Sequence, residues 1–366
     1  MSRATTDGRR MCSLASRASG EDPIGTASAF QVCVAMELPT PWVGLWSEAA
    51  TASKELLDAF APAWERGATV RPLALAPDSV YSVPGKRRVL FFKRPAMPFD
   101  TFDRSEYLVS ETALAPLVDA YLNSPANLQG FRSYEQANSG MRDLLVCTHG
   151  NVDACCARFG FPAYREIREE CATGASGRVR AWRCSHFGGH RFAPTMITFP
   201  DGRYWARLNE GASRSVMSRA GDIEGLVPHY RGWAGLDTPF EQVVEREVWR
   251  VEGWRWHDYR VSGRVLDIGG GLGVPDEELK VEDGPEWAEV RLEFERPDGS
   301  RGAYEARVEV CGRVTTVGCG RAAEPVLQYR LTRFARFAGA WNARDLRGPE
   351  VPSHTPLAPA ANATSY

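Results

Sequence analysis

The chain has 366 residues, of which 43% are hydrophobic and 25% are charged, and its formal net charge is −2. That length exceeds one ordinary hydrophobic core, so we expect at least two domains with terminal tails. The near-neutral charge argues against general binding to nucleic acid or to a membrane surface, and no stretch approaches the roughly 20 apolar residues that span a bilayer.

The amino terminus and the cysteines indicate a compartment. Residues 1–20 lack the apolar stretch of a secretory signal. The nine cysteines are more typical of thiols or metal ligands than of disulfides in a chain of this size kept in a reducing compartment. We therefore expect a cytoplasmic protein.

The first folded unit is predicted over residues 28–122, after a polar and flexible N-terminus at 1–27. Its elements follow one another in the order typical of an α/β fold. Apolar runs predict strands at 29–37, 69–75 and 88–93, and apolar residues at helical spacing predict helices at 53–66 and 111–121.

A second unit, predicted over residues 123–235, repeats this order. Apolar patterns predict strands at 143–147 and 179–183, helices at 162–171 and 210–219, and a hairpin at 195–207. Open α/β sheets place their sites at the carboxyl ends of strands, so we expect a functional site where the first two of these strands end.

From residue 236 to residue 346 the pattern changes to a small α+β region. A helix is predicted at 240–254, and strands at 287–294 and 304–310 form a hairpin. The acidic run within 271–300 is interpreted as a solvated surface. The tail at 347–366, rich in proline, alanine and serine, is expected to be disordered.

One short segment offers a pair of thiol ligands. Residues 147–156 read Cys-Thr-His-Gly-Asn-Val-Asp-Ala-Cys-Cys, in which Cys147 pairs with either Cys155 or Cys156 across a polar loop. A buried cysteine is often only a small hydrophobic residue, and Cys171 on its helix face is interpreted in that way. Cys311 and Cys319 have no histidine nearby and are also interpreted as structural cysteines.

A second segment offers a pair of imidazoles. Residues 182–190 read Trp-Arg-Cys-Ser-His-Phe-Gly-Gly-His, and the two glycines between His186 and His190 favour a tight loop over a helix. Two thiolates with two imidazoles are a ligand set for zinc or for an iron–sulfur cluster. Five neighbouring residues are candidates to orient the imidazoles or to offset charge: His149, Asp153, Arg183, Ser185 and Arg191.

These segments resemble the sucrase/ferredoxin-like family, whose members include fungal thioredoxin-fold ferredoxins linked to actin-patch distribution. The likeness covers roughly residues 11–340 and is most specific at His186-Phe-Gly-Gly-His-Arg-Phe-Ala193. The matching segments are 22–27, 146–156, 182–194, 199–202 and 230–233.

The resemblance implies a thioredoxin-like domain that holds a [2Fe–2S] cluster on two cysteines and two histidines. Carried over residue by residue, it assigns Cys147, Cys156, His186 and His190 as ligands. The family's second cysteine follows an Asp-x-x step, which matches Cys156, while Cys155 stays a rival ligand. The "sucrase" of the family name finds no support, because glycoside hydrolysis needs a placed pair of carboxylates and no such motif stands out.

We therefore expect a one-electron carrier, more than a substrate-converting enzyme, that exchanges electrons with a redox donor or acceptor protein. Two alternatives stay open. A structural Cys₂His₂ zinc module fits the spacing of the two histidines, although the two cysteines are farther apart than zinc ligands usually are. A cluster-free thiol oxidoreductase would use Cys155 and Cys156, but the chain has no Cys-x-x-Cys motif there.

Overall fold

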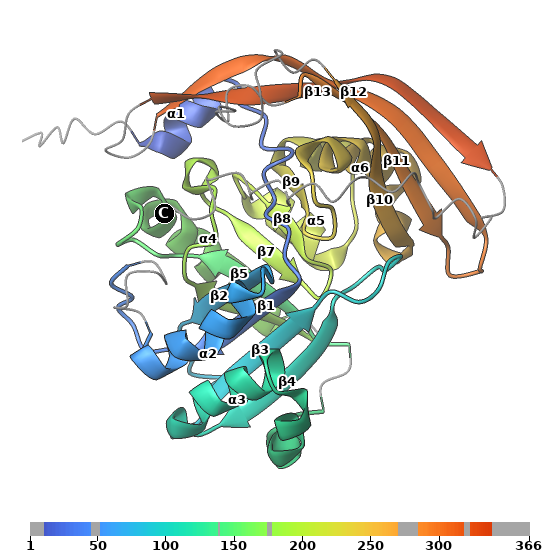
Figure 1. Ribbon diagram of the computed structural model, residues 1–366. Helices are drawn as coiled ribbons and strands as arrows, with labels where there is room; N and C mark the ends of the chain where they lie inside the picture. The colour runs from blue at the N-terminus through green and yellow to red at the C-terminus, as the bar shows by residue number, and fades with distance from the viewer. Residues whose placement is uncertain are drawn as a thin grey trace, which may run out of the picture.

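The protein is described by a computed structural model over residues 11–44, 52–137, 140–173, 178–269, 285–317 and 323–338. Within these residues, a nine-stranded mixed sheet with helices precedes a separate four-stranded antiparallel sheet (Figure 1). The predicted fold class, α/β followed by a small α+β appendage, is confirmed.

The helices and strands of the described residues follow one another along the chain as α1 (Cys12–Ala18), β1 (Val32–Glu37), α2 (Lys54–Glu65), β2 (Val70–Leu75), β3 (Arg87–Lys93), β4 (Asp103–Val109), α3 (Leu114–Leu122), β5 (Arg142–Cys147), α4 (Ala154–Thr173), β6 (Val179–Cys184), β7 (Met196–Phe199), β8 (Arg203–Trp205), α5 (Glu210–Ser218), β9 (Tyr230–Trp233), α6 (Pro239–Glu252), β10 (Arg260–Gly269), β11 (Trp287–Glu295), β12 (Arg301–Val317) and β13 (Ala323–Ala338). Short 3₁₀ helices lie at Glu111–Ala113, Pro125–Tyr134, His190–Phe192, Glu224–His229 and Gly253–Asp258.

The first half of the large sheet consists of β1 to β4. Strand β1 pairs in parallel with β2 and antiparallel with β3, and β3 pairs antiparallel with β4. Helix α2 connects β1 to β2, and the Ser53 side chain accepts a hydrogen bond from the backbone N–H of Leu56 at its start. The predicted elements of this half are confirmed. The sequence pattern does not predict β4, because its first four residues, 103–106, are all polar.

The second half, β5 to β9, has the same pairing. Strand β5 pairs in parallel with β6 and antiparallel with β7, which pairs with β8, and β9 adds a further strand. This β-α-β-β order with helix α4 as the crossover is thioredoxin-like. Helix α4 begins at Ala154, well before the predicted start at residue 162. The Asp153 carboxylate accepts a 2.8 Å hydrogen bond from the backbone N–H of Cys155 and so caps this helix.

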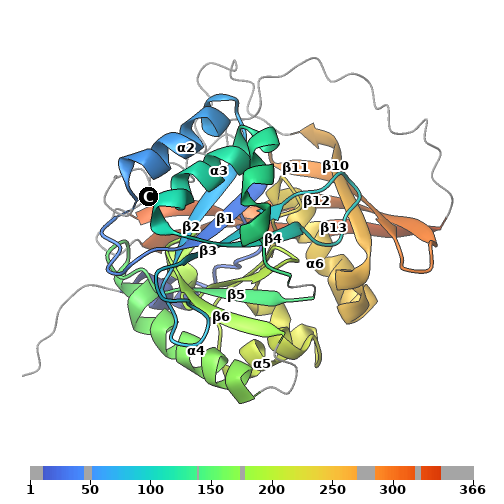
Figure 2. The same ribbon diagram turned by 90° about the horizontal axis from the view of Figure 1, so that it is seen from below.

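The two halves meet at the carboxyl ends of β2 and β6. Leu75 and Cys184 are paired there in antiparallel fashion, which makes one continuous sheet of both halves. The sheet then folds back on itself, so that β3 and β4 lie across from β5 and β6 (Figure 2). The ring of Phe92 stacks on that of Phe199 with centroids 3.8 Å apart. The predicted units 28–122 and 123–235 are thus two adjacent parts of one sheet.

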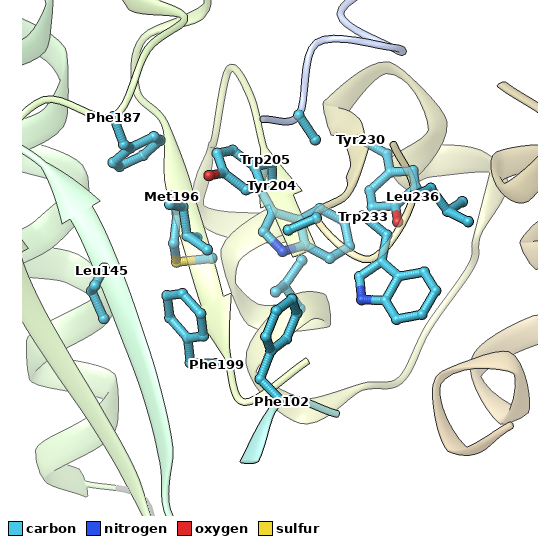
Figure 3. Close-up of a cluster of buried hydrophobic side chains, with 14 of the residues drawn as sticks. Phe102, Leu145, Phe187, Met196, Phe199, Tyr204, Trp205, Tyr230, Trp233 and Leu236 are labelled. Carbon is cyan, nitrogen blue, oxygen red and sulfur yellow. The ribbon is translucent and has the colours of Figure 1, made fainter. Parts of the chain in front are cut away.

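Aromatic side chains fill the core of the second half (Figure 3). Met196 and Phe199 of β7 and Trp205 of β8 are fully buried, and Phe102 reaches them from the first half. Because burying such large apolar side chains is the main favourable term in folding, this core fixes the strands that carry the site.

Helix α6 packs against the C-terminal sheet, in which β10 to β13 are antiparallel neighbours in chain order. Thr238 and Glu241 form a capping box at the start of α6. The predicted hairpin is β11 and β12. Cys311 is exposed on β12. Cys319, most of the acidic run (270–284) and the tail at 347–366 lie outside the described residues. No helix in the described part of the chain has the length and apolarity needed to cross a membrane.

Candidate metal centre

Strands β5 and β6 bring the two ligand segments together. Cys147 is the last residue of β5 and is paired with Cys184, the last residue of β6. The backbone N–H of Thr148 also donates to the carbonyl of Cys184, at 3.1 Å. Because the two strands are parallel, the residues that follow them leave from the same edge of the sheet, and His186 is therefore close to Cys147.

Gly160 allows helix α4 to approach the end of β5 closely. A Cβ atom at this position would lie 2.0 Å from the carbonyl oxygen of Cys147, which no side chain tolerates. Cys156 lies in the first turn of the same helix, because α4 begins at Ala154. The absent side chain of Gly160 thus lets the helix carry Cys156 against the strand end.

Cys147, Cys156 and His186 form a buried group of donor atoms that all lie within 4.8 Å of one another. Nδ1 of His186 is 3.7 Å from Sγ of Cys147 and 3.6 Å from Sγ of Cys156. Burial opposes ionisation, but hydrogen bonds from Cys156 and His186 hold the pKa of the Cys147 thiol well below its usual value. The pKa of Cys156 is raised, because this thiol donates to its neighbour and is buried. The group therefore offers a thiolate, a thiol and an imidazole to one point.

The loop from His186 to His190 turns at two glycines. Gly188 and Gly189 have φ angles of +91° and +78°, which side-chain-bearing residues rarely adopt. A Cβ on Gly189 would lie 2.5 Å from the guanidinium carbon of Arg231. The predicted tight loop is confirmed, and the two glycines allow both its curvature and the close approach of an arginine.

Arg231 braces this loop from β9. Its guanidinium donates to the carbonyl of Gly188 at 3.1 Å and to the carbonyl of Thr26 at 2.7 Å. Burial lowers the pKa of Arg231 to about 10, so the group is still charged at neutral pH. These bonds explain why the segments at 22–27 and 230–233 accompany the histidine loop in the sequence pattern.

His149 holds the backbone of His186. Nδ1 of His149 accepts a hydrogen bond from the His186 N–H at 3.3 Å. The other nitrogen, Nε2, therefore carries the proton and donates to the carbonyl of Trp42 at 3.1 Å. Trp42 follows β1 of the first half, and no sequence signal marks it as part of the site. His149 thus links the two halves at the ligand loop.

His190 lies beside His186 but faces a second group of side chains. The centroids of the two imidazoles are 5.9 Å apart. Nδ1 of His190 is 3.1 Å from the Asp153 carboxylate and 3.2 Å from Sγ of Cys12. Asp153, predicted to orient an imidazole, is thus in contact with one of the two histidines.

Cys155 belongs to this second group and not to the group around Cys147. Its Sγ atom lies 3.4 Å from Sγ of Cys12. Cys12 begins α1, far away in the sequence, and its polar surroundings carry no signal that predicts this position. Adjacent cysteines diverge in this way because successive side chains of a helix point about 100° apart.

The remaining three predicted neighbours contact the surrounding framework. Ser185 Oγ accepts a 2.9 Å hydrogen bond from the backbone N–H of Ala74 in β2. The other two are arginines: Arg191 pairs with Glu21 at 2.6 Å, and the guanidinium of Arg183 lies 5.0 Å from the ring centre of Phe161.

The model of the sucrase/ferredoxin-like family matches residues 23–232, more than half of the chain, and the chain therefore belongs to this family. Among solved structures, a thioredoxin-like [2Fe–2S] ferredoxin from Aquifex aeolicus is similar to part of the chain. The two share 11% identity, the match covers 22% of this chain and 80% of that chain, and the TM-score is 0.21. That similarity is too low to carry an argument. None of the curated proteins matches the chain.

Proposed function

We propose that the protein is an electron carrier that holds a [2Fe–2S] cluster on Cys147, Cys156, His186 and His190. The main supporting observation is the buried convergence of two cysteines and one histidine at the carboxyl ends of two parallel strands. Membership of the family supports the same assignment.

The donor set suits such a cluster. When bound, a cluster with two imidazoles in place of two thiolates accepts and releases one electron at a higher potential than an all-thiolate cluster. The low pKa of Cys147 supplies a thiolate in the absence of metal. The positive charge of Arg231, buried behind the histidine loop, offsets negative charge at the site.

His190 is the ligand through which we expect electrons to enter and leave. Its side chain is 15% exposed, whereas Cys147 and Cys156 are each 1% exposed. Its Nδ1 faces Asp153, so Nε2 is the nitrogen left for the cluster. We expect the redox donor or acceptor protein to dock over this edge, and neither nucleic acid nor membrane to take part.

The alternatives differ in what the site would contain. A structural zinc ion would use the same four residues. A thiol oxidoreductase would need Cys155 and Cys156 to act together, but their sulfur atoms belong to two different groups, which disfavours this alternative. The cytoplasm is the compartment that we propose, because thiols stay reduced there.

The proposal is tested on the full chain purified without oxygen, with iron, zinc and acid-labile sulfide assayed on the same sample. We expect visible charge-transfer bands with iron and sulfide in near-equal amounts. His186→Cys should keep the iron, change the spectrum and lower the potential, because thiolate replaces imidazole.

His229→Gln serves as the control, since this half-buried histidine bonds the carbonyl of Ala206 on the far side of β8 and should leave the spectrum unchanged. A colourless protein carrying zinc in place of iron would overturn the proposal in favour of the structural module. An unchanged spectrum in His186→Cys would remove that histidine from the ligand set.

A further inference from the structure

A second group of metal-binding side chains lies beside the first. Cys12, Asp153 and Cys155 are buried, and their donor atoms all lie within 4.8 Å of one another. They come from α1, from the cap of α4 and from its first turn. Nδ1 of His190 faces the same point from the histidine loop.

The donor atoms have the separations of ligands around a single ion. Sγ of Cys12 is 3.4 Å from Sγ of Cys155, 3.8 Å from either oxygen of Asp153 and 3.2 Å from Nδ1 of His190. Nδ1 of His190 is in turn 3.1 Å from Oδ2 of Asp153. In a tetrahedral zinc site with ordinary bond lengths, neighbouring donors are about 3.4 to 3.8 Å apart. The observed separations fall within a few tenths of an ångström of that range.

From this geometry we propose that Cys12, Cys155, Asp153 and Nδ1 of His190 form a second, mononuclear metal site for zinc(II). Two sulfurs, one nitrogen and one carboxylate oxygen suit zinc, which accepts all three kinds of ligand. The sulfur atoms are 3.4 Å apart, well beyond the length of a disulfide bond.

Charge favours a cation at this point. Asp153 is 6% exposed and the two cysteines are fully buried, and a buried carboxylate is costly unless it is paired. The backbone N–H of Cys155 supplies part of that pairing, together with the amino end of α4. Zinc would supply the rest. On binding, both thiols lose their protons and the metal takes the place of the Nδ1 proton of His190, so protons are released.

The second site would fasten three distant segments together. Cys12 begins α1, Cys155 lies in α4, and His190 lies in the loop after β6. A metal ion here holds α1 against the ligand loop and leaves Nε2 of His190 for the first centre. His190 would then lie between two metals, one on each ring nitrogen.

The test measures zinc and iron together in the full chain, purified in buffer containing zinc and then dialysed. We expect about one zinc ion per wild-type chain in addition to iron. Cys12→Ser should lower zinc at least tenfold and keep the iron and the visible spectrum. Cys147→Ser should do the opposite. Cys171→Ser, a half-buried cysteine of α4 away from both groups, should change neither.

Asp153→Asn keeps the helix cap, because asparagine caps as well as aspartate, but it removes a charged ligand. It therefore separates metal binding from folding should Cys12→Ser unfold the chain. Cobalt(II) added to metal-depleted protein should give thiolate charge-transfer bands that weaken in both variants.

The proposal is overturned if the wild type retains no zinc, if Cys12→Ser and Asp153→Asn retain it, or if thiol titration finds Cys12 and Cys155 in a disulfide. Zinc that is lost in Cys12→Ser from a protein without iron would refute the cluster and leave the second site standing. Iron that stays in a protein without zinc would do the reverse.

Discussion

The two halves of the large sheet share one backbone plan, but only the second carries metal-binding residues. In each half a parallel strand pair is joined by a helix, and two antiparallel strands follow on the side of the first strand. The loops after β2 and β6, residues 76–86 and 185–195, have the same length. The halves can therefore be matched position by position.

At the matched positions the first half has no ligand chemistry. The strand end that holds Cys147 is Glu37, and the third helical residue that holds Cys156 is Leu56. In the loop after the second strand, Pro77 and Tyr81 stand in the positions of His186 and His190. These four matched residues are Glu37, Leu56, Pro77 and Tyr81.

The residues of the first half serve structure. Glu37 is buried, and its carboxylate accepts hydrogen bonds from the Ser82 hydroxyl and from the backbone N–H of Arg88. The first half also supports the site of the second, through the carbonyl of Trp42 and the backbone N–H of Ala74. The comparison teaches that the shared topology supplies a scaffold, while the function depends on a few donor atoms placed on one copy.

The largest effect is expected where the two helices differ in their distance from the strand. The seventh residue of α2 is the buried Phe60, whereas the seventh residue of α4 is Gly160. Gly160→Ala would place a methyl group on the carbonyl of Cys147, so the helix must move away and take Cys156 with it. We expect iron per chain to fall at least tenfold, together with a lower Tm.

Gly130→Ala is the matched control, since a Cβ there meets nothing within 4 Å, and it should leave iron and Tm unchanged. A Gly160→Ala protein with full iron content would show that the close approach of α4 is not needed for the site.

The glycines also show what the sequence predicts and what it does not. The pair Gly188-Gly189 predicts a tight loop correctly, because positive φ angles are a local property of glycine. The early start of α4 is missed, because apolar spacing does not reveal the cap that Asp153 forms. Cys12 is missed for a different reason: its contacts with Cys155 and His190 join residues far apart in the sequence, and only the packed fold brings them together.

The contact between the halves can be broken at Asp143. This fully buried carboxylate of β5 accepts hydrogen bonds from Arg104 of the first half and from Arg180 and Trp182 of the second. Asp143→Asn leaves buried guanidinium groups without their charge partner. We expect a loss of about 3–5 kcal/mol in the free energy of unfolding at pH 7, measured by urea denaturation.

The same carboxylate sets a pH dependence. Burial opposes its ionisation, but the charges of Arg180 and Arg104 outweigh burial and hold the pKa of Asp143 below its usual value. Its stabilising contribution is therefore present above the unfolded pKa of about 4 and is lost as the pH falls towards the lower folded pKa. Below about pH 4, wild-type stability should fall more steeply than that of Asp143→Asn. Asp103→Asn, an exposed change on β4, should stay within about 0.5 kcal/mol of wild type. Parallel acid curves for wild type and Asp143→Asn would contradict this account.

The smallest effect is expected at His149, where the first half contacts the ligand loop of the second. His149→Phe removes both the acceptor for the His186 N–H and the donor to the Trp42 carbonyl. Loss of such an orienting contact typically weakens metal binding about 10–100-fold, so we expect a chelator to remove iron correspondingly more easily. His149→Asn keeps an acceptor near the position of Nδ1 but is too short to reach Trp42. If the bond to His186 matters most, this variant should hold iron nearly as well as wild type; if the first half positions the loop through Trp42, it should behave as His149→Phe does. Chelator titrations of the two variants therefore decide whether the half without ligands helps to hold the metal or only supports the sheet.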